Sequence, residues 1–247
     1  MYDPTLRTIA FTRFLQAHNL GGGKTSYPAI RSMRGAPYSL TAIRAGGRLG
    51  DALERLAATV LFLLLLPVLL VTAVTIVVLS QRSPLVAHRR CGVAGAPFWT
   101  LKFRTMWSRE RPRGEQRWIE YLVDEQGPER KAAADPRVVS RFARFCRRFS
   151  VDELPQLVNV IRGEMSFVGP RPLTRRELER HYAGCLEEVL QVKPGITGLW
   201  QIQGRSRLTY AERRRRDLYL VRNRCFRLYV RILLRTFPVV FRGENCW

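Results

Sequence analysis

The longest apolar stretch of the chain covers residues 56–79, 24 residues without a charge. As an α-helix it would be roughly 36 Å long, which exceeds the hydrocarbon core of a bilayer at about 30 Å. A signal peptide does not fit, because the stretch begins more than fifty residues into the chain and lacks a small-residue cleavage site before the next polar segment. The pattern predicts a helix inserted in a membrane.

Positive residues flank both ends of this stretch. They are Arg44, Arg48 and Arg55 before it, and Arg82, Arg89, Arg90, Lys102 and Arg104 after it. Because cytoplasmic flanks are enriched in Lys and Arg, both ends should face the cytoplasm, which a straight span does not allow. Pro67 should split the stretch into residues 56–66 and 68–79, each about 17 Å long. We expect a re-entrant helix-break-helix, with a kinked spanning helix as the alternative.

The remaining segments set the domain boundaries. Residues 1–46 mix Gly, Ser, Pro and Arg without a sustained period, which predicts a disordered cytoplasmic extension. Its GGGKTS at 21–26 resembles the end of a phosphate-binding loop, but His18 stands where that motif needs its first glycine. Residues 47–82 are the predicted membrane helix, and residues 83–247 the predicted cytoplasmic domain that carries the chemistry.

Shorter periodic patterns predict a mixture of strand and helix. Residues 97–106 indicate a strand, and residues 137–149 a helix that is basic on one side and apolar on the other. The apolar side would hold Val138, Phe142, Phe145, Cys146 and Phe149. Residues 222–241 repeat this pattern, which suits an anionic membrane surface but is also typical of ordinary surface helices. The expected fold class is α+β and mostly helical: a membrane-embedded helix, a small catalytic domain and interfacial amphipathic helices.

Composition narrows the classes of partner. The 247 residues can form one medium domain, and 42 Lys plus Arg against 20 Asp plus Glu give a net charge of +22. Such a charge favours nucleic acid, phosphorylated substrates or anionic lipids. We expect no nucleic acid, because no groove-binding module is present and the tryptophans are scattered. Five cysteines without a C-x-x-C pair favour reduced thiols over disulfides or a zinc site.

Two adjacent acids mark a candidate site. The sequence SVDE at 150–153 matches an S-x-x-E capping box and begins a predicted helix that runs to Arg162 and is stopped by Gly163. Acids at a helix start are favourable in any protein. A capping role does not account for Asp152, which adjoins Glu153 and follows Arg147. Paired carboxylates can share a hard cation, and arginines can bind phosphate oxygens. The segment is therefore a candidate phosphoryl-transfer centre.

Two further segments extend this candidate site. In FVGPRP at 167–172, a proline on each side aims Arg171 in advance, which lowers the ordering cost of binding an anion. KPGITGLWQIQGRS at 193–206 predicts a turn at residues 194–195. Its glycines permit close approach of a ligand, although such loops are more often simple turns.

These motifs together resemble a known family. LKFRTM at 101–106, SVDELPQLVNVIRGEMSFVGPRP at 150–172 and KPGITGLWQIQGRS at 193–206 are similar to motifs of the bacterial sugar transferases, the monotopic phosphoglycosyl transferases. The resemblance implies transfer of a sugar 1-phosphate from a nucleotide diphosphate sugar, usually a UDP-sugar, to a polyprenyl phosphate such as undecaprenyl phosphate, with release of UMP. It implies that Asp152 is the nucleophile of a phosphosugar-enzyme intermediate, that Glu153 helps to bind magnesium, and that the membrane helix is re-entrant.

Three positions depart from the family pattern. Leu66 precedes Pro67 where the family usually has serine, so no hydroxyl is placed to satisfy the carbonyl that the proline frees. Ser206 stands in place of the usual asparagine and Phe149 in place of the usual threonine, and either change could alter the choice of sugar. A single membrane stretch makes the chain look like the small form of the family.

The expected ligands follow from the resemblance and from the positive side chains near its motifs. The predicted phosphate-binding residues are Lys102, Arg104, Arg147, Arg171 and Arg205. Magnesium at Glu153 is the expected cofactor; nucleotide sugar, polyprenyl phosphate and membrane lipid are the expected partners, and a homo-oligomer stays open. We expect the inner cell membrane, with the catalytic domain on its cytoplasmic face. The glycan begun could be exopolysaccharide, capsule, O-antigen or glycoprotein glycan, and a non-catalytic scaffold of a polysaccharide complex remains the alternative function.

Overall fold

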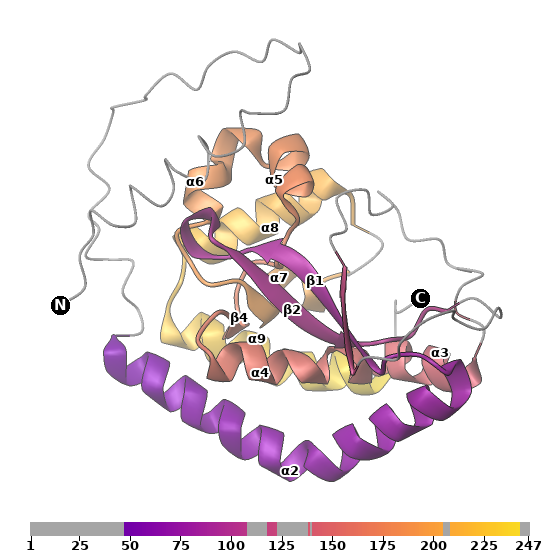
Figure 1. The fold of residues 1–247 in the computed structure, drawn as a ribbon. Helices are drawn as coiled ribbons and strands as arrows, with labels where there is room; N and C mark the ends of the chain where they lie inside the picture. The colour runs from indigo at the N-terminus through magenta and orange to yellow at the C-terminus, as the bar shows by residue number, and fades with distance from the viewer. Residues whose placement is uncertain (1–46, 108–117, 123–137, 139, 205–207, 243–247) are drawn as a thin grey trace, which may run out of the picture.

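The structure is a computed structural model that describes residues 47–107, 118–122, 138, 140–204 and 208–242 (Figure 1). Two predictions fall elsewhere in the chain. The extension over residues 1–46 and the phosphate-binding role of Arg205 lie outside the described residues.

Helix α2 (Arg48–Ser80) contains the whole apolar stretch. Among the described residues it is the one helix long and apolar enough to cross a membrane. The predicted separation into two helices is not found, because α2 continues through Pro67. Figure 1 shows a bend near its middle instead. Proline removes only one N–H from the helical ladder, and a bend relieves the clash between its ring and the preceding turn.

A three-stranded sheet follows α2, with the order β2-β1-β3. Its strands are β1 (Leu85–Cys91), β2 (Pro97–Phe103) and β3 (Ile119–Leu122). Strand β2 is antiparallel to β1, whereas β3 is parallel to it. The connection between β1 and β2 contains a short 3-10 helix, η1 (Val93–Gly95), in which Ala94 and Gly95 have positive φ angles. The strand predicted within residues 97–106 is confirmed and ends at Phe103.

Helix α3 (Arg141–Arg148) is shorter than the helix predicted over residues 137–149. Ser140 caps it, because its Oγ accepts hydrogen bonds from two backbone N–H groups of the first turn. The buried residues of α3 are Ala143, Cys146 and Arg147. Phe145 is 52% exposed, and its ring lies against the rings of Phe142 and Phe149, so these three residues share one apolar side as predicted. The buried residues follow the i, i+3, i+4 spacing of a helix face.

The acid pair lies in η2 (Val151–Gln156), a 3-10 helix that leads directly into α4 (Leu157–Ile161). The predicted capping box is wrong: Ser150 has a φ of 55°, and its side chain makes no capping hydrogen bond. Asp152 and Glu153 nevertheless occupy the first turn of η2.

A second sheet joins β4 (Ser166–Val168) and β5 (Gly195–Thr197) in parallel. Strand β5 begins at Gly195, where the sequence predicts a turn. A Cβ atom on Gly195 would lie 2.0 Å from the backbone nitrogen of Gly169, and one on Gly198 would lie 2.5 Å from the carbonyl oxygen of Gly169. These glycines therefore allow two backbone segments to approach each other, rather than a ligand.

The remaining helices of the described chain follow β4 in the sequence. They are α5 (Arg175–His181), η3 (Ala183–Cys185), α6 (Leu186–Val189), α7 (Leu199–Ile202), α8 (Tyr210–Arg222) and α9 (Phe226–Arg242). The helix predicted over residues 222–241 corresponds to α9. Both α5 and α8 begin with a capping box, which Thr174 forms with Glu177 and Thr209 forms with Glu212.

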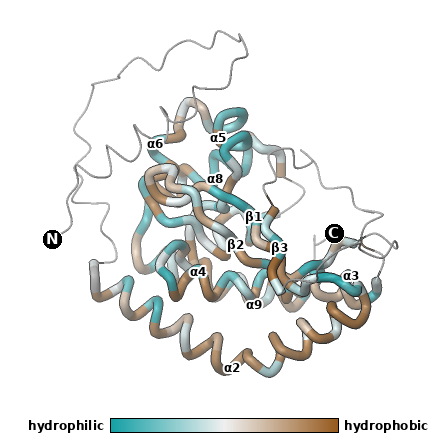
Figure 2. Tube along the Cα trace, in the orientation of Figure 1, coloured by the Kyte–Doolittle hydropathy of each residue, from teal (hydrophilic) through white to brown (hydrophobic). Residues whose placement is uncertain are grey.

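Both halves of α2 pack against the rest of the described chain. In the first half, Ala58 is fully buried against Leu157 of α4 and Met165. In the second half, Leu69 and Ile76 cluster with Phe103 of β2. The outer side of α2 exposes leucine and valine side chains along its length, and Figure 2 shows this hydrophobic character in brown.

Candidate active site

A small, open hollow lies between the first sheet, η2, the loop that precedes α5, and the segment of β5 and α7. Its charged lining residues are Arg90, Lys102, Glu153 and Arg171. Three of the predicted site residues, Lys102, Glu153 and Arg171, are therefore brought together from segments far apart in the sequence. The register of the sheet contributes Arg90, because the pairing of His88 with Thr100 puts Arg90 and Lys102 on the same face.

Lys102 and Glu153 form an ion pair at this hollow. The Nζ atom of Lys102 donates to Oε1 of Glu153 over 2.6 Å. A predicted phosphate-binding cation and a predicted metal-binding carboxylate are thus held as partners. A charge-assisted hydrogen bond of this length fixes both side chains.

Asp152 stands one residue from the wall of the hollow, in the same turn of η2 as Glu153. It also acts on Cys146 of α3, which is fully buried. Burial first, and the Asp152 charge second, raise the pKa of the Cys146 thiol to about 12. Cys146 therefore stays neutral near Asp152 and adds no second negative charge.

Arg104 and Arg147 are not among the described residues that line the hollow. Arg104 is buried; its Nε donates to the carbonyl of Ser83 over 2.8 Å, and its guanidinium pairs with Glu120 of β3. Arg147 is also buried, and within the described parts of the chain its Nε has no hydrogen-bond partner.

Arg171 is constrained by an aromatic ring in addition to its two prolines. Its guanidinium carbon lies 5.7 Å from the centroid of the Trp200 ring, and that of Arg213 lies 4.9 Å from the same centroid. Cation–π contacts of this kind are favourable and orient the guanidinium group. Burial and the nearby Arg171 charge lower the pKa of Arg213.

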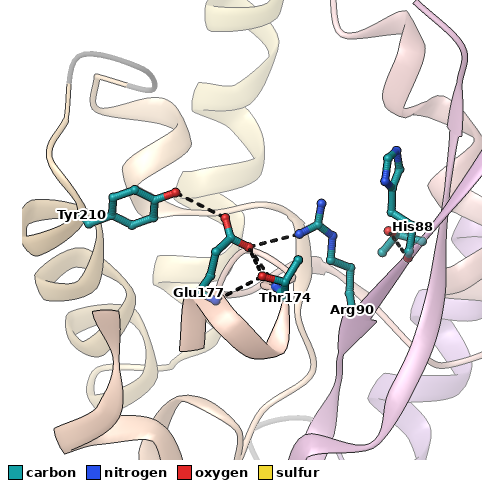
Figure 3. Close-up of polar contacts among 6 residues, drawn as sticks. His88, Arg90, Thr174, Glu177 and Tyr210 are labelled. Carbon is teal, nitrogen blue, oxygen red and sulfur yellow. Dashed lines mark hydrogen bonds and ion pairs between the residues drawn. The ribbon is translucent and has the colours of Figure 1, made fainter. Parts of the chain in front are cut away.

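Sequence reasoning missed Arg90 and Glu177 as members of the site. Figure 3 shows Arg90 reaching from β1 toward Glu177 of α5, with Tyr210 on the other side of the same carboxylate. Burial raises the pKa of Glu177, but Arg90, the Thr174 backbone N–H and Arg171 together outweigh it, so the pKa is lowered. The T-x-x-E spacing at 174–177 could have identified the cap, but nothing local links it to β1.

The acid pair also suits a magnesium ion. Among the described residues no three His, Cys, Asp or Glu side chains gather into a cluster. Magnesium does not require one, because it is usually held by one or two carboxylates together with substrate phosphates and waters. Asp152 and Glu153 offer two carboxylates in one turn, so the donor set fits a magnesium ion that displaces Lys102 from Oε1 of Glu153.

Comparison with known proteins agrees with the motifs. The family model described as bacterial sugar transferase matches residues 47–243. The UDP-galactose-lipid carrier transferase of Erwinia amylovora is 39% identical over 186 residues, which cover 74% of this chain and 38% of that protein.

Two further relatives match over more of their own length. The exopolysaccharide production protein ExoY of Rhizobium meliloti is 39% identical over 201 residues, 79% of this chain and 86% of ExoY. The UDP-glucose:undecaprenyl-phosphate glucose-1-phosphate transferase of Caulobacter vibrioides is 35% identical over 205 residues, 79% of this chain and 70% of that protein. The chain belongs to the bacterial sugar transferase family.

Proposed function

We propose that the protein transfers a sugar 1-phosphate from a nucleotide diphosphate sugar, a UDP-sugar, to a polyprenyl phosphate, undecaprenyl phosphate. The names of the Erwinia and Caulobacter relatives support the donor and acceptor classes. The observation that carries the proposal is the convergence of Lys102, Arg171 and Glu153 on one hollow beside Asp152. The product would begin the assembly of a surface polysaccharide.

In the proposed first step, a carboxylate oxygen of Asp152 attacks the phosphorus that carries the sugar. A bond from that oxygen to phosphorus forms, the bond between the two phosphates breaks, and UMP leaves with the electron pair. In the second step, a phosphate oxygen of the polyprenyl phosphate attacks the same phosphorus, and the Asp152 carboxylate is released. One phosphoanhydride replaces another, so the enzyme needs mainly to position the groups and to offset phosphate charge.

The positive side chains would supply most of that charge stabilisation. Lys102 and Arg171 line the hollow, which supports their assignment to the diphosphate, and Arg147 is a buried cation close to the acid pair in sequence. Magnesium at Glu153, when bound, would further neutralise the diphosphate. Neutral Cys146 leaves Asp152 without a competing thiolate.

The contacts of α2 support a re-entrant helix with both ends on the cytoplasmic side of the inner membrane. Near its start, Asp51 pairs with Lys193 over 3.0 Å. Its second half packs through Ile76 on Phe103. A helix of 33 residues is about 50 Å long, so a straight span would carry its two halves to opposite sides of the bilayer. Attachment of both halves to the same domain favours a helix that enters and returns.

The function is tested by trapping the proposed intermediate. The full-length protein in nanodiscs is incubated with UDP-glucose or UDP-galactose labelled in the sugar, without acceptor, and then denatured. We expect label on the wild-type protein and none on Asp152→Asn, which is nearly isosteric and should still insert. With undecaprenyl phosphate added, the wild type should form labelled lipid and the variant should not.

Other outcomes would change the assignment. Lipid product without protein-bound label would point to a single displacement in a ternary complex. Equal lipid product from Asp152→Asn would remove Asp152 as the nucleophile. No product from a panel of nucleotide sugars would favour the non-catalytic scaffold.

A further inference from the structure

Arg90 places a positive charge at the hollow that the motifs do not assign. It lies on β1, with its side chain 17% exposed, and it lines the hollow together with Lys102, Glu153 and Arg171. Its neighbour Arg89 is exposed and points to the other face of the strand, as alternation requires. The two arginines therefore meet different surroundings, although they are adjacent in the sequence.

Glu177 holds Arg90 in this position. The Nη1 atom of Arg90 donates to Oε2 of Glu177 over 3.1 Å. The same carboxylate accepts hydrogen bonds from the backbone N–H and the hydroxyl of Thr174, at 2.8 and 3.1 Å, and from the hydroxyl of Tyr210 at 3.3 Å. Two other elements, the cap of α5 and the start of α8, thus fix the anion that orients Arg90 (Figure 3).

The charge balance of the hollow favours an anionic ligand. Three of its charged lining residues, Arg90, Lys102 and Arg171, are positive, and only Glu153 is negative. Lys102 is paired with Glu153 and Arg90 with Glu177, which leaves the positive charge of Arg171 in excess. Guanidinium groups match phosphate oxygens in geometry as well as charge.

We propose that Arg90 is a further phosphate-binding residue for the diphosphate of the donor, and that Glu177 is its positioning residue. This proposal rests on the donor class of the proposed function. Arg90 on β1 and Arg171 in the loop before α5 then both bind the diphosphate. The bound donor therefore contacts two parts of the fold that line the hollow.

The competing explanation is that the Arg90–Glu177 pair only ties β1 to α5. A structural tie would affect stability and all substrates together. A phosphate contact would affect the donor and not the lipid acceptor. The test must therefore separate donor binding, acceptor use and folding.

The experiment uses full-length protein in nanodiscs and three variants, Arg90→Gln, Arg90→Lys and the matched control Arg89→Gln. UDP binding is titrated directly, and kcat and KM are measured for UDP-glucose or UDP-galactose and for undecaprenyl phosphate. We expect Arg90→Gln to weaken UDP binding and raise the donor KM at least tenfold, with the acceptor KM unchanged. Arg90→Lys should recover part of the loss, and Arg89→Gln should behave as wild type.

Glu177→Gln tests the positioning role. Glutamine can still complete the capping box, so the start of α5 should persist while the charge that orients Arg90 is lost. We expect a donor KM raised severalfold, less than in Arg90→Gln, and no effect from the exposed control Glu179→Gln. Combining Glu177→Gln with Arg90→Gln should add little to the donor KM of Arg90→Gln alone.

Each outcome decides a separate question. A wild-type donor KM and UDP affinity in Arg90→Gln would overturn the proposal while leaving the transferase function intact. A wild-type protein that neither binds UDP nor transfers sugar phosphate would overturn the donor class and this proposal with it. If Arg90→Gln does not fold, Arg90→Lys and Glu177→Gln decide, and equal losses for donor and acceptor in both would establish a structural tie.

Discussion

The molecule has two faces of different hydropathy, which Figure 2 separates by colour. On the face formed by α2 and α9, large apolar side chains are exposed, among them Phe226, Leu234, Phe237 and Phe241 of α9. On the opposite face, α5 and α8 are teal and rich in arginine and glutamate. A soluble protein would bury such an apolar face, so its exposure is what a membrane surface requires.

The contrast explains the position of the site. The acid pair adjoins the apolar side, because Leu154, next to Glu153, packs with the cluster of Leu69, Ile76 and Phe103. Toward the polar side, α8 places Arg213 over the same ring as Arg171, which lines the hollow. The proposed transfer between a lipid and a water-soluble donor would need such an arrangement, with the acid pair at the boundary of the two faces.

The largest effect should come from the charge at that boundary. Glu153→Gln should lower turnover by several orders of magnitude, because the amide cannot help to neutralise the diphosphate through magnesium. Excess chelator should stop the wild-type enzyme, and added magnesium should restore it. The exposed Glu187→Gln on α6 serves as the control and should keep full turnover. Full activity in chelator would mean that the positive side chains alone carry the diphosphate charge.

A smaller effect should follow from loosening the apolar face from the rest of the protein. Oε1 of Glu54 on α2 accepts hydrogen bonds from the Ser166 hydroxyl, the Phe167 N–H and the Tyr229 hydroxyl, at 2.6, 2.8 and 2.6 Å. Replacing this anion with an amide in Glu54→Gln should destabilise the fold by about 2 kcal/mol, since hydrogen bonds to charged groups are the stronger ones. The more exposed pair of Asp51 and Lys193 should matter less, so Asp51→Asn should cost under about 1 kcal/mol.

Urea unfolding of both variants in the same detergent measures the difference. Equal losses of unfolding free energy would show that Glu54 is an ordinary surface contact. In that case the three donors around it would not be what fixes α2 to β4 and α9.

The sequence predicts the parts of this molecule that depend on composition or on short-range pattern. The membrane helix is evident from its uncharged length, and β2 from its short apolar pattern. The convergence of Lys102, Glu153 and Arg171 follows from the family motifs, which a single chain would not reveal without the resemblance.

The failures share a physical cause, which is a partner far away in sequence. The capping box at 150–153 does not form, and Glu153 pairs with Lys102, 51 residues earlier, instead of with the start of its own helix. Gly195 and Gly198 allow the backbone to approach Gly169 closely, and no local sequence pattern predicts this contact. Arg90 differs from Arg89 only by the face of β1 on which it lies, and that depends on the register with β2.

On the polar face, a buried acid should make stability depend on pH. Asp217 is fully buried, accepts a hydrogen bond from Tyr182 over 2.8 Å, and lies near Arg171 and Arg213. Burial raises its pKa from 3.8 to about 7. Between these values the folded protein binds a proton that the unfolded chain has released, so stability should fall as pH rises through this window and level off above about 7.

Asp217→Asn should remove this component of the pH dependence and raise the thermal midpoint at pH 8 relative to wild type, because the amide is never charged. The midpoints of both proteins are compared from pH 5 to pH 8.5 at one scan rate, with the exposed Glu179→Gln as the control. Parallel pH profiles for wild type and Asp217→Asn would show that Asp217 is ionised in the folded protein over the whole range.

The smallest effect should come from the bend of the apolar face itself. Pro67→Leu restores an uninterrupted apolar stretch of 24 residues, which is long enough to span, so it should favour a straight helix. Two contributions oppose this change: the positive flank that would have to cross the membrane, and the contacts that tie both halves of α2 to the same domain. We therefore expect only partial inversion, with a proportional loss of activity.

The topology is measured with single cysteines in a background without the native cysteines. One replaces Gly47, where a new side chain meets open space, and the other replaces the exposed Ala96; they report the two flanks of α2. In intact cells both should resist a membrane-impermeant thiol reagent, and Pro67→Leu should make a fraction of the Gly47→Cys population reactive while Ala96→Cys stays protected. Labelling of Gly47→Cys from outside without the Pro67 change would show a true span and would contradict the re-entrant helix.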